Sequence, residues 1–80
     1  MIISAPLGAT LRIVKSFRDF DGAEHAAGTE LKLIKRDFFP YDGGYTFTFE
    51  GGRVVRLSEN VPENDAVLAA PAGVYFEIRP

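Results

Sequence analysis

Residues 45–58 read YTFTFEGGRVVRLS, and this stretch decides the fold class. In its first half aromatic residues alternate with polar ones, which is typical of a strand with one buried face. In its second half Val55 and Leu57 share one face. Between the halves, Gly51 and Gly52 supply the positive φ that a tight hairpin turn needs. The stretch therefore predicts two antiparallel strands, over 45–50 and 53–58, with one apolar face.

Working outward, the same alternation predicts three more strands, over residues 10–17, 30–38 and 74–79. The alternation loses its phase at Leu33-Ile34, which indicates a β-bulge or a strong twist. Residues 62–70 predict a short helix, because Pro62 and nearby acids suit a helix start. Long connections remain over 18–29 and 38–44.

This order predicts a mostly β fold: a five-stranded SH3-like small barrel with one short helical turn before the last strand. We expect residues 1–80 to form a single domain. An OB-type barrel also has five strands. Its helix would usually lie between the third and fourth strands, where this chain has only two glycines, so the SH3-like order is preferred.

Two segments carry a more specific likeness, FRDFDG at 17–22 and FFPYDGG at 38–44. Together with Gly8, His25, Gly28 and the strand end RVVRLSEN, they resemble a small uncharacterised bacterial family filed as a domain of unknown function. The family pattern is FxDYDG…FxPYDxG, and the likeness covers about residues 7 to 76. It implies a compact SH3-like barrel and supplies no activity, substrate or partner.

Composition limits the chemistry. The chain has 80 residues, a formal net charge of −2 and no cysteine, which excludes disulfides, thiolate metal sites and cysteine nucleophiles. The first residues show neither a basic region nor a long apolar run, so we expect no signal peptide and a cytoplasmic protein. No apolar run has the length needed to cross a bilayer, and we expect no membrane partner.

The candidate binding site rests on two similar segments. Residues 13–22 read IVKSFRDFDG and residues 34–43 read IKRDFFPYDG, with four of the ten positions identical. An SH3-like fold would bring their loops together at one end of a groove. The predicted ligand-binding residues are Phe20, Asp21, Phe39, Pro40, Tyr41 and Asp42. Such a groove suits an extended or proline-rich segment, with acidic neighbours that attract a basic flank.

The structural alternative is a satellite core, in which the two loops fold over each other and the rings bury together. Asp19, Asp21 and Asp42 would then be turn formers that bond nearby backbone N–H groups.

Other chemistry finds little support. Residues 19–24 hint at a calcium loop, but Glu30 is not placed to complete the ligand series. His25 is the only histidine and has no visible nucleophile partner. We expect it to hydrogen-bond a backbone carbonyl in its loop. The sequence therefore predicts no enzyme activity, no metal and no cofactor.

The function predicted from the sequence is a non-enzymatic module that binds a protein or peptide. Self-association through an exposed edge strand such as 74–79 is a further expectation. The alternative is a barrel that binds single-stranded nucleic acid, such as RNA, by stacking bases beside basic side chains. The residues for that alternative are Tyr41, Tyr45, Tyr75, Arg12, Lys32, Arg53 and Arg56. A sequence pI of about 5.2 argues against it.

Overall fold

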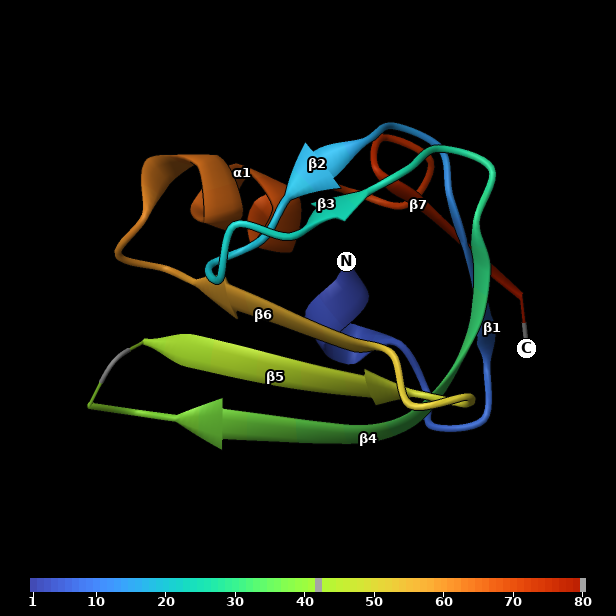
Figure 1. The fold of residues 1–80 in the computed structure, drawn as a ribbon, viewed down its shortest axis with the longest axis horizontal. Helices are drawn as coiled ribbons and strands as arrows, with labels where there is room; N and C mark the ends of the chain where they lie inside the picture. Colours follow the sequence, from blue (N-terminus) through green and yellow to red (C-terminus); the bar gives the residue numbers. More distant parts are fainter. Residues whose placement is uncertain (42, 80) are drawn as a thin grey trace.

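The computed structural model describes residues 1–41 and 43–79. A five-stranded antiparallel sheet has the order β6-β5-β4-β1-β7, and β2 and β3 form a second sheet of two strands (Figure 1). The elements are η1 (Ile2–Ser4), β1 (Thr10–Ile13), β2 (Phe17–Arg18), β3 (Glu24–His25), β4 (Glu30–Phe39), β5 (Gly44–Phe49), β6 (Val54–Ser58), α1 (Pro62–Ala69) and β7 (Phe76–Arg79). The predicted mostly β class with one short helix is confirmed.

The predicted β5–β6 hairpin is confirmed as well. Phe47 lies opposite Val55, and both side chains are fully buried. The Phe49 N–H donates to the Arg53 carbonyl at 2.8 Å, which closes a loop over residues 50–52. Gly51 and Gly52 have φ of 89° and 87°, a region that side chains with a Cβ rarely adopt.

The long strand β4 joins the two halves of the sheet. Its first residues pair with β1 and its later ones with β5, and the register shifts between Leu33 and Lys35. The bulge predicted from the sequence is thereby confirmed. Because a bulge adds bend and twist to its strand, the sheet curls, and Figure 1 shows β4 curving from beside β1 to beneath β5. Over the described residues, β6 and β7 end the sheet without pairing with each other, so the sheet is not a closed barrel.

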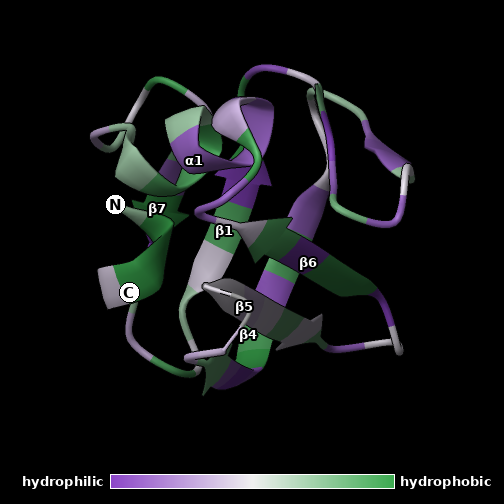
Figure 2. Cartoon of the chain, turned by 90° about the vertical axis from the view of Figure 1, so that its left-hand side faces the viewer, coloured by the Kyte–Doolittle hydropathy of each residue, from purple (hydrophilic) through white to green (hydrophobic). Residues whose placement is uncertain are grey.

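The hydrophobic core lies inside this curl. The long strands contribute alternate residues to it, and Figure 2 shows green, hydrophobic segments on these strands. Ile2 of η1 and Val67 and Leu68 of α1 join the strand residues in the core. The helix packs against β6, η1 and β2.

Two predicted strands are shorter than expected. β1 ends at Ile13, and Phe17–Arg18 pairs instead with Glu24–His25 in a separate hairpin inside the predicted long loop. β7 begins only at Phe76, and Val74 is exposed rather than buried. The cause is a turn before β7, in which the Gly73 N–H donates to the Phe76 carbonyl at 2.6 Å.

Within residues 1–41 and 43–79, no helix has both the length and the apolar character to span a membrane.

Candidate functional site: a groove between two aromatic loops

An open groove with a volume of about 540 Å³ lies where three connections meet. These are the β2–β3 turn, the β4–β5 loop and the turn that follows β6. The lining residues are Phe20, Phe39, Tyr41, Gly44, Tyr45, Thr46, Arg56, Leu57, Ser58, Asn60 and Val61. The groove therefore combines aromatic rings from segments that are distant in sequence.

The β2–β3 turn reaches the groove by docking on the outer edge of β6. The Phe20 N–H donates to the Arg56 carbonyl at 2.7 Å, which continues the backbone bonding beyond the sheet. The Phe20 ring remains 57% exposed. Asp21 follows it and forms an ion pair with Arg56 at 3.6 Å, so this predicted site residue lies at the rim.

The β4–β5 loop forms the opposite wall. The Glu59 N–H donates to the Gly43 carbonyl at 2.8 Å, which ties this loop to the end of β6. Phe39 is 49% exposed and Tyr41 is 100% exposed. Pro40 is exposed but does not line the groove, and Asp42 lies outside the described residues.

The satellite-core alternative is therefore wrong for Phe20, Phe39 and Tyr41, because their rings face solvent. Phe17 does join the core and packs edge-on against Phe76 with ring centroids 5.4 Å apart. Of the six predicted site residues, the structure brings three aromatics together, puts Asp21 beside them and leaves Pro40 outside.

The peptide-binding prediction left out Tyr45, which the sequence analysis assigned only to the nucleic-acid alternative, although Tyr45 lines the groove. Tyr45 stacks on Phe47 at 6.0 Å and touches Phe38 at 4.7 Å, so it continues the core into the groove wall. Burial raises the pKa of the Tyr45 hydroxyl, and the neighbouring Glu59 carboxylate, which accepts its hydrogen bond, raises it further. Its position at the end of an alternating aromatic strand was the available signal for a partly exposed ring.

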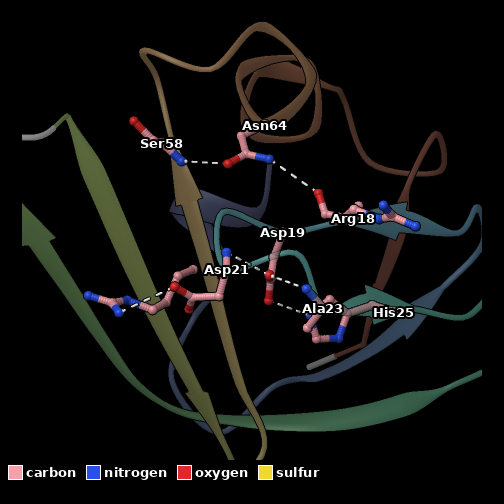
Figure 3. A network of polar contacts seen from close by, with 8 residues as sticks. Arg18, Asp19, Asp21, Ala23, His25, Ser58 and Asn64 are labelled. Carbon is pink, nitrogen blue, oxygen red and sulfur yellow. Dashed lines mark hydrogen bonds and ion pairs between the residues drawn. The ribbon is translucent and has the colours of Figure 1, made fainter.

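A buried acid and histidine hold the β2–β3 turn in shape (Figure 3). One carboxylate oxygen of Asp19 accepts the backbone N–H groups of Asp21 and Ala23, at 3.0 and 2.9 Å. The other lies 2.8 Å from His25 Nε2, and both side chains are almost fully buried. Asp19 is confirmed as a turn former. The expected bond from His25 to a backbone carbonyl is wrong, because the turn folds the Asp19 carboxylate onto its ring.

A second buried polar side chain, that of Asn64, connects three elements next to the groove. Asn64 of α1 accepts the Ser58 N–H at 3.2 Å and donates to the Arg18 carbonyl at 3.2 Å (Figure 3). One side chain thus connects β6, α1 and β2. No pattern in the sequence indicated this role, since Asn64 lies in a helix start where polar residues are common.

The residues of the nucleic-acid alternative are separated. Tyr41, Tyr45 and Arg56 line the groove. Elsewhere, Arg12 pairs with Glu77 at 3.8 Å and Lys32 with Glu50 at 4.0 Å. Tyr75 lies beneath the Lys15 ammonium, 5.1 Å from it. The basic side chains of that alternative are therefore divided between the groove and other parts of the surface.

The described part of the chain contains no cluster of three histidine, aspartate or glutamate side chains that could hold a metal ion. The polar groups around the groove are suited to hydrogen bonding and ring stacking.

Comparison with known proteins supports the fold. No protein-family model and no curated protein matches the chain, so the likeness to a bacterial family stays a prediction. One similar solved structure is an integron cassette protein from the mobile metagenome of Vibrio cholerae, with a TM-score of 0.73 and 21% sequence identity. The match covers 92% of this chain and 87% of that protein. At this identity the likeness concerns the fold alone.

Proposed function

We propose that this chain has the SH3-like arrangement of strands, with its sheet curled but open, and that it binds an extended protein segment in the aromatic groove. The strand order supports the fold assignment. A hairpin follows β1, a helix precedes the last strand, and β4 bends to serve both halves of the sheet. The order of the five sheet strands and the helix is the one expected from the sequence, while η1 and the β2–β3 hairpin are additions to it. The helix packs against β6, η1 and β2.

The observation that carries the proposal is the exposure of Phe20, Phe39 and Tyr41 around one groove. Exposed aromatic rings gathered in one place are typical of protein interaction surfaces, where such rings supply most of the binding energy. The loops that carry them are held by backbone bonds to β6 and its following residue. A bound segment therefore needs little reorganisation of the walls, which favours affinity.

Charge around the groove favours a segment with basic residues. Residues 58–73, which begin at the groove and continue through α1, contain Glu59, Glu63 and Asp65 and neither lysine nor arginine. Among the described residues that line the groove, the charged side chain is Arg56, and Asp21 pairs with it. A basic flank on the ligand would be attracted to Glu59, whose carboxylate accepts the hydrogen bond of the groove residue Tyr45, and would associate faster at low salt.

The test is selection from a random peptide library, followed by calorimetry on the selected peptides. We expect enriched peptides with basic residues, and Phe39→Ala should weaken their binding at least about tenfold, as for an interface anchor. Ile34→Ala is the matched control, because Ile34 lies on the same strand with 51% exposure but outside the groove. Equal binding by both variants would contradict the proposal.

The second candidate, binding of single-stranded RNA, draws on Tyr41, Tyr45 and Arg56 in the groove. It predicts salt-sensitive retention on an immobilised RNA oligonucleotide. If the unaltered chain is retained on the RNA at low salt, and Phe39→Ala and Tyr41→Ala are not, the result would favour RNA over a peptide as the ligand. An absence of retention at low salt would eliminate this candidate.

A further inference from the structure

The two edges of the five-stranded sheet differ in how their backbone groups are satisfied. On the outer edge of β6, the Arg56 carbonyl accepts the Phe20 N–H, and the Ser58 N–H donates to Asn64. That edge is covered by the β2–β3 turn and α1. The other edge strand, β7, has only β1 beside it in the described sheet.

The direction of the free backbone groups on β7 follows from its pairing. The Val14 N–H donates to the Tyr75 carbonyl at 2.8 Å, so Tyr75, Glu77 and Arg79 turn their backbone groups toward β1. Phe76 and Ile78 therefore turn theirs outward. The Phe76 carbonyl is taken by the Gly73 N–H. For the outward N–H and carbonyl of Ile78, the described residues provide no partner.

The C-terminal half of β7 is open to a partner. In the described sheet, no strand lies on the side of β7 away from β1. An outward N–H and carbonyl on an uncovered edge form a template for another strand. The remaining question is which strand would match it.

The sequence Glu77-Ile78-Arg79 is complementary to a second, antiparallel copy of itself. In an antiparallel pair centred on Ile78, the two copies of Ile78 exchange both backbone bonds. Glu77 then lies directly opposite Arg79 of the second copy, twice by symmetry, and opposite charges at this spacing are favourable. Both side chains are about half exposed where they form their own ion pairs within the chain, so they are within reach of a second copy.

The apolar side of the strand also continues across the pair. Ile78 is partly buried against the core, on the same face as Phe76. Its counterpart in the second copy would meet it on that face and remove its remaining apolar surface from water.

We propose that the chain forms a two-fold symmetric dimer through antiparallel pairing of β7 with β7 of a second copy. The sheet then runs continuously through both copies, and the contact is isologous. The described groove-lining residues come from elements other than β1 and β7, so both copies keep their grooves open. A ligand with two suitable segments would bind such a dimer with avidity.

The test uses sedimentation equilibrium over a concentration series, because the contact is short and the dimer is expected to be weak. Ile78→Ala removes most of the side chain and keeps the N–H, whereas Ile78→Pro also removes the N–H that points away from β1. Loss of the two symmetric bonds should raise the dissociation constant of Ile78→Pro about tenfold or more above that of Ile78→Ala. A chain that is monomeric at every concentration, or equal dimerisation of both variants, would overturn the proposal.

A second measurement does not depend on how Ile78→Pro folds. Hydrogen exchange of the Ile78 amide in the unaltered chain should slow as concentration rises, while exchange at the exposed loop amide of Gly22 should not. No concentration dependence at Ile78 would also contradict the dimer. Phe39→Ala should dimerise like the unaltered chain, because Phe39 lies in the groove and not on β7. The dimer proposal can therefore succeed even if the peptide-binding proposal fails, and the two failures can be told apart.

Discussion

Two segments with similar sequences differ in how far the fold buries their aromatic side chains. Residues 13–22 and 34–43 share four of ten positions, and each ends in an aromatic-Asp-Gly sequence. Each also makes a turn at the equivalent place. The Gly22 N–H donates to the Asp19 carbonyl at 3.1 Å, and the Gly43 N–H donates to the Pro40 carbonyl at 3.4 Å.

Burial separates the two segments. Phe17 is 7% exposed and its counterpart Phe38 is 48% exposed. In the first segment, Asp19 bonds the turn and pairs with buried His25. In the second, the equivalent residue is Pro40, which has no side-chain acceptor. The difference shows that local sequence sets the turn, while contacts with other strands decide whether the turn is anchored in the core or presents its rings to solvent.

The largest effect should come from removing the anchor of the first turn. Asp19→Ala leaves two backbone N–H groups without their acceptor. It also leaves His25 buried without its carboxylate, when His25 Nδ1 already has no partner among the described residues. We expect a loss of about 3 kcal/mol in the free energy of unfolding, measured by urea denaturation.

Pro40→Ala is the matched control at the equivalent position of the second turn. It should change the free energy of unfolding by less than about 1 kcal/mol, because Pro40 mainly restricts the unfolded chain. Similar losses in the two variants would show that the anchor does not distinguish the turns.

The next comparison replaces the equivalent phenylalanines. Phe17→Ala should cost about 3 kcal/mol, since Phe17 contacts Phe76, Tyr75 and His25 in the core. Phe38→Ala should cost about 1 kcal/mol, because its ring contacts mainly Tyr45 and is half exposed. Thermal unfolding of both variants measures the difference, and a larger loss for Phe38→Ala would reverse the comparison.

The smallest effects concern the turn glycines. Gly22 has φ of 85°, and a Cβ at this position would meet open space, so Gly22→Ala should cost about 1 kcal/mol through backbone strain alone. Gly43 has φ of 58°, and a Cβ there would lie 3.3 Å from Asn60 Nδ2. Gly43→Ala should have a similar cost in urea denaturation but should also weaken peptide binding, because Asn60 lines the groove. Unchanged peptide affinity would show that Asn60 does not shift.

The sequence was informative where structure depends on neighbouring residues. The β5–β6 hairpin and the bulge after Leu33 were predicted, and the helix predicted over 62–70 is observed over Pro62–Ala69. The predicted strand over 10–17 was wrong beyond Ile13, because its apolar pattern continues into Phe17 of a separate hairpin. Alternation alone does not distinguish one long strand from two short strands that share a core.

By itself, therefore, the sequence determined the presence and order of the five sheet strands, the β5–β6 turn and the aromatic loops that form the candidate site, but not where β1 ends or where β7 begins. Only the tertiary structure decided that Phe20, Phe39 and Tyr41 stay exposed around the groove and do not bury against each other. It also decided that Asp19 meets His25 and that Asn64 connects β6 to β2. The physical reason is the difference in sequence separation over which the interactions act. Periodicity and turn chemistry act over a few residues, whereas burial and polar pairing depend on which distant segments the folded chain brings into contact.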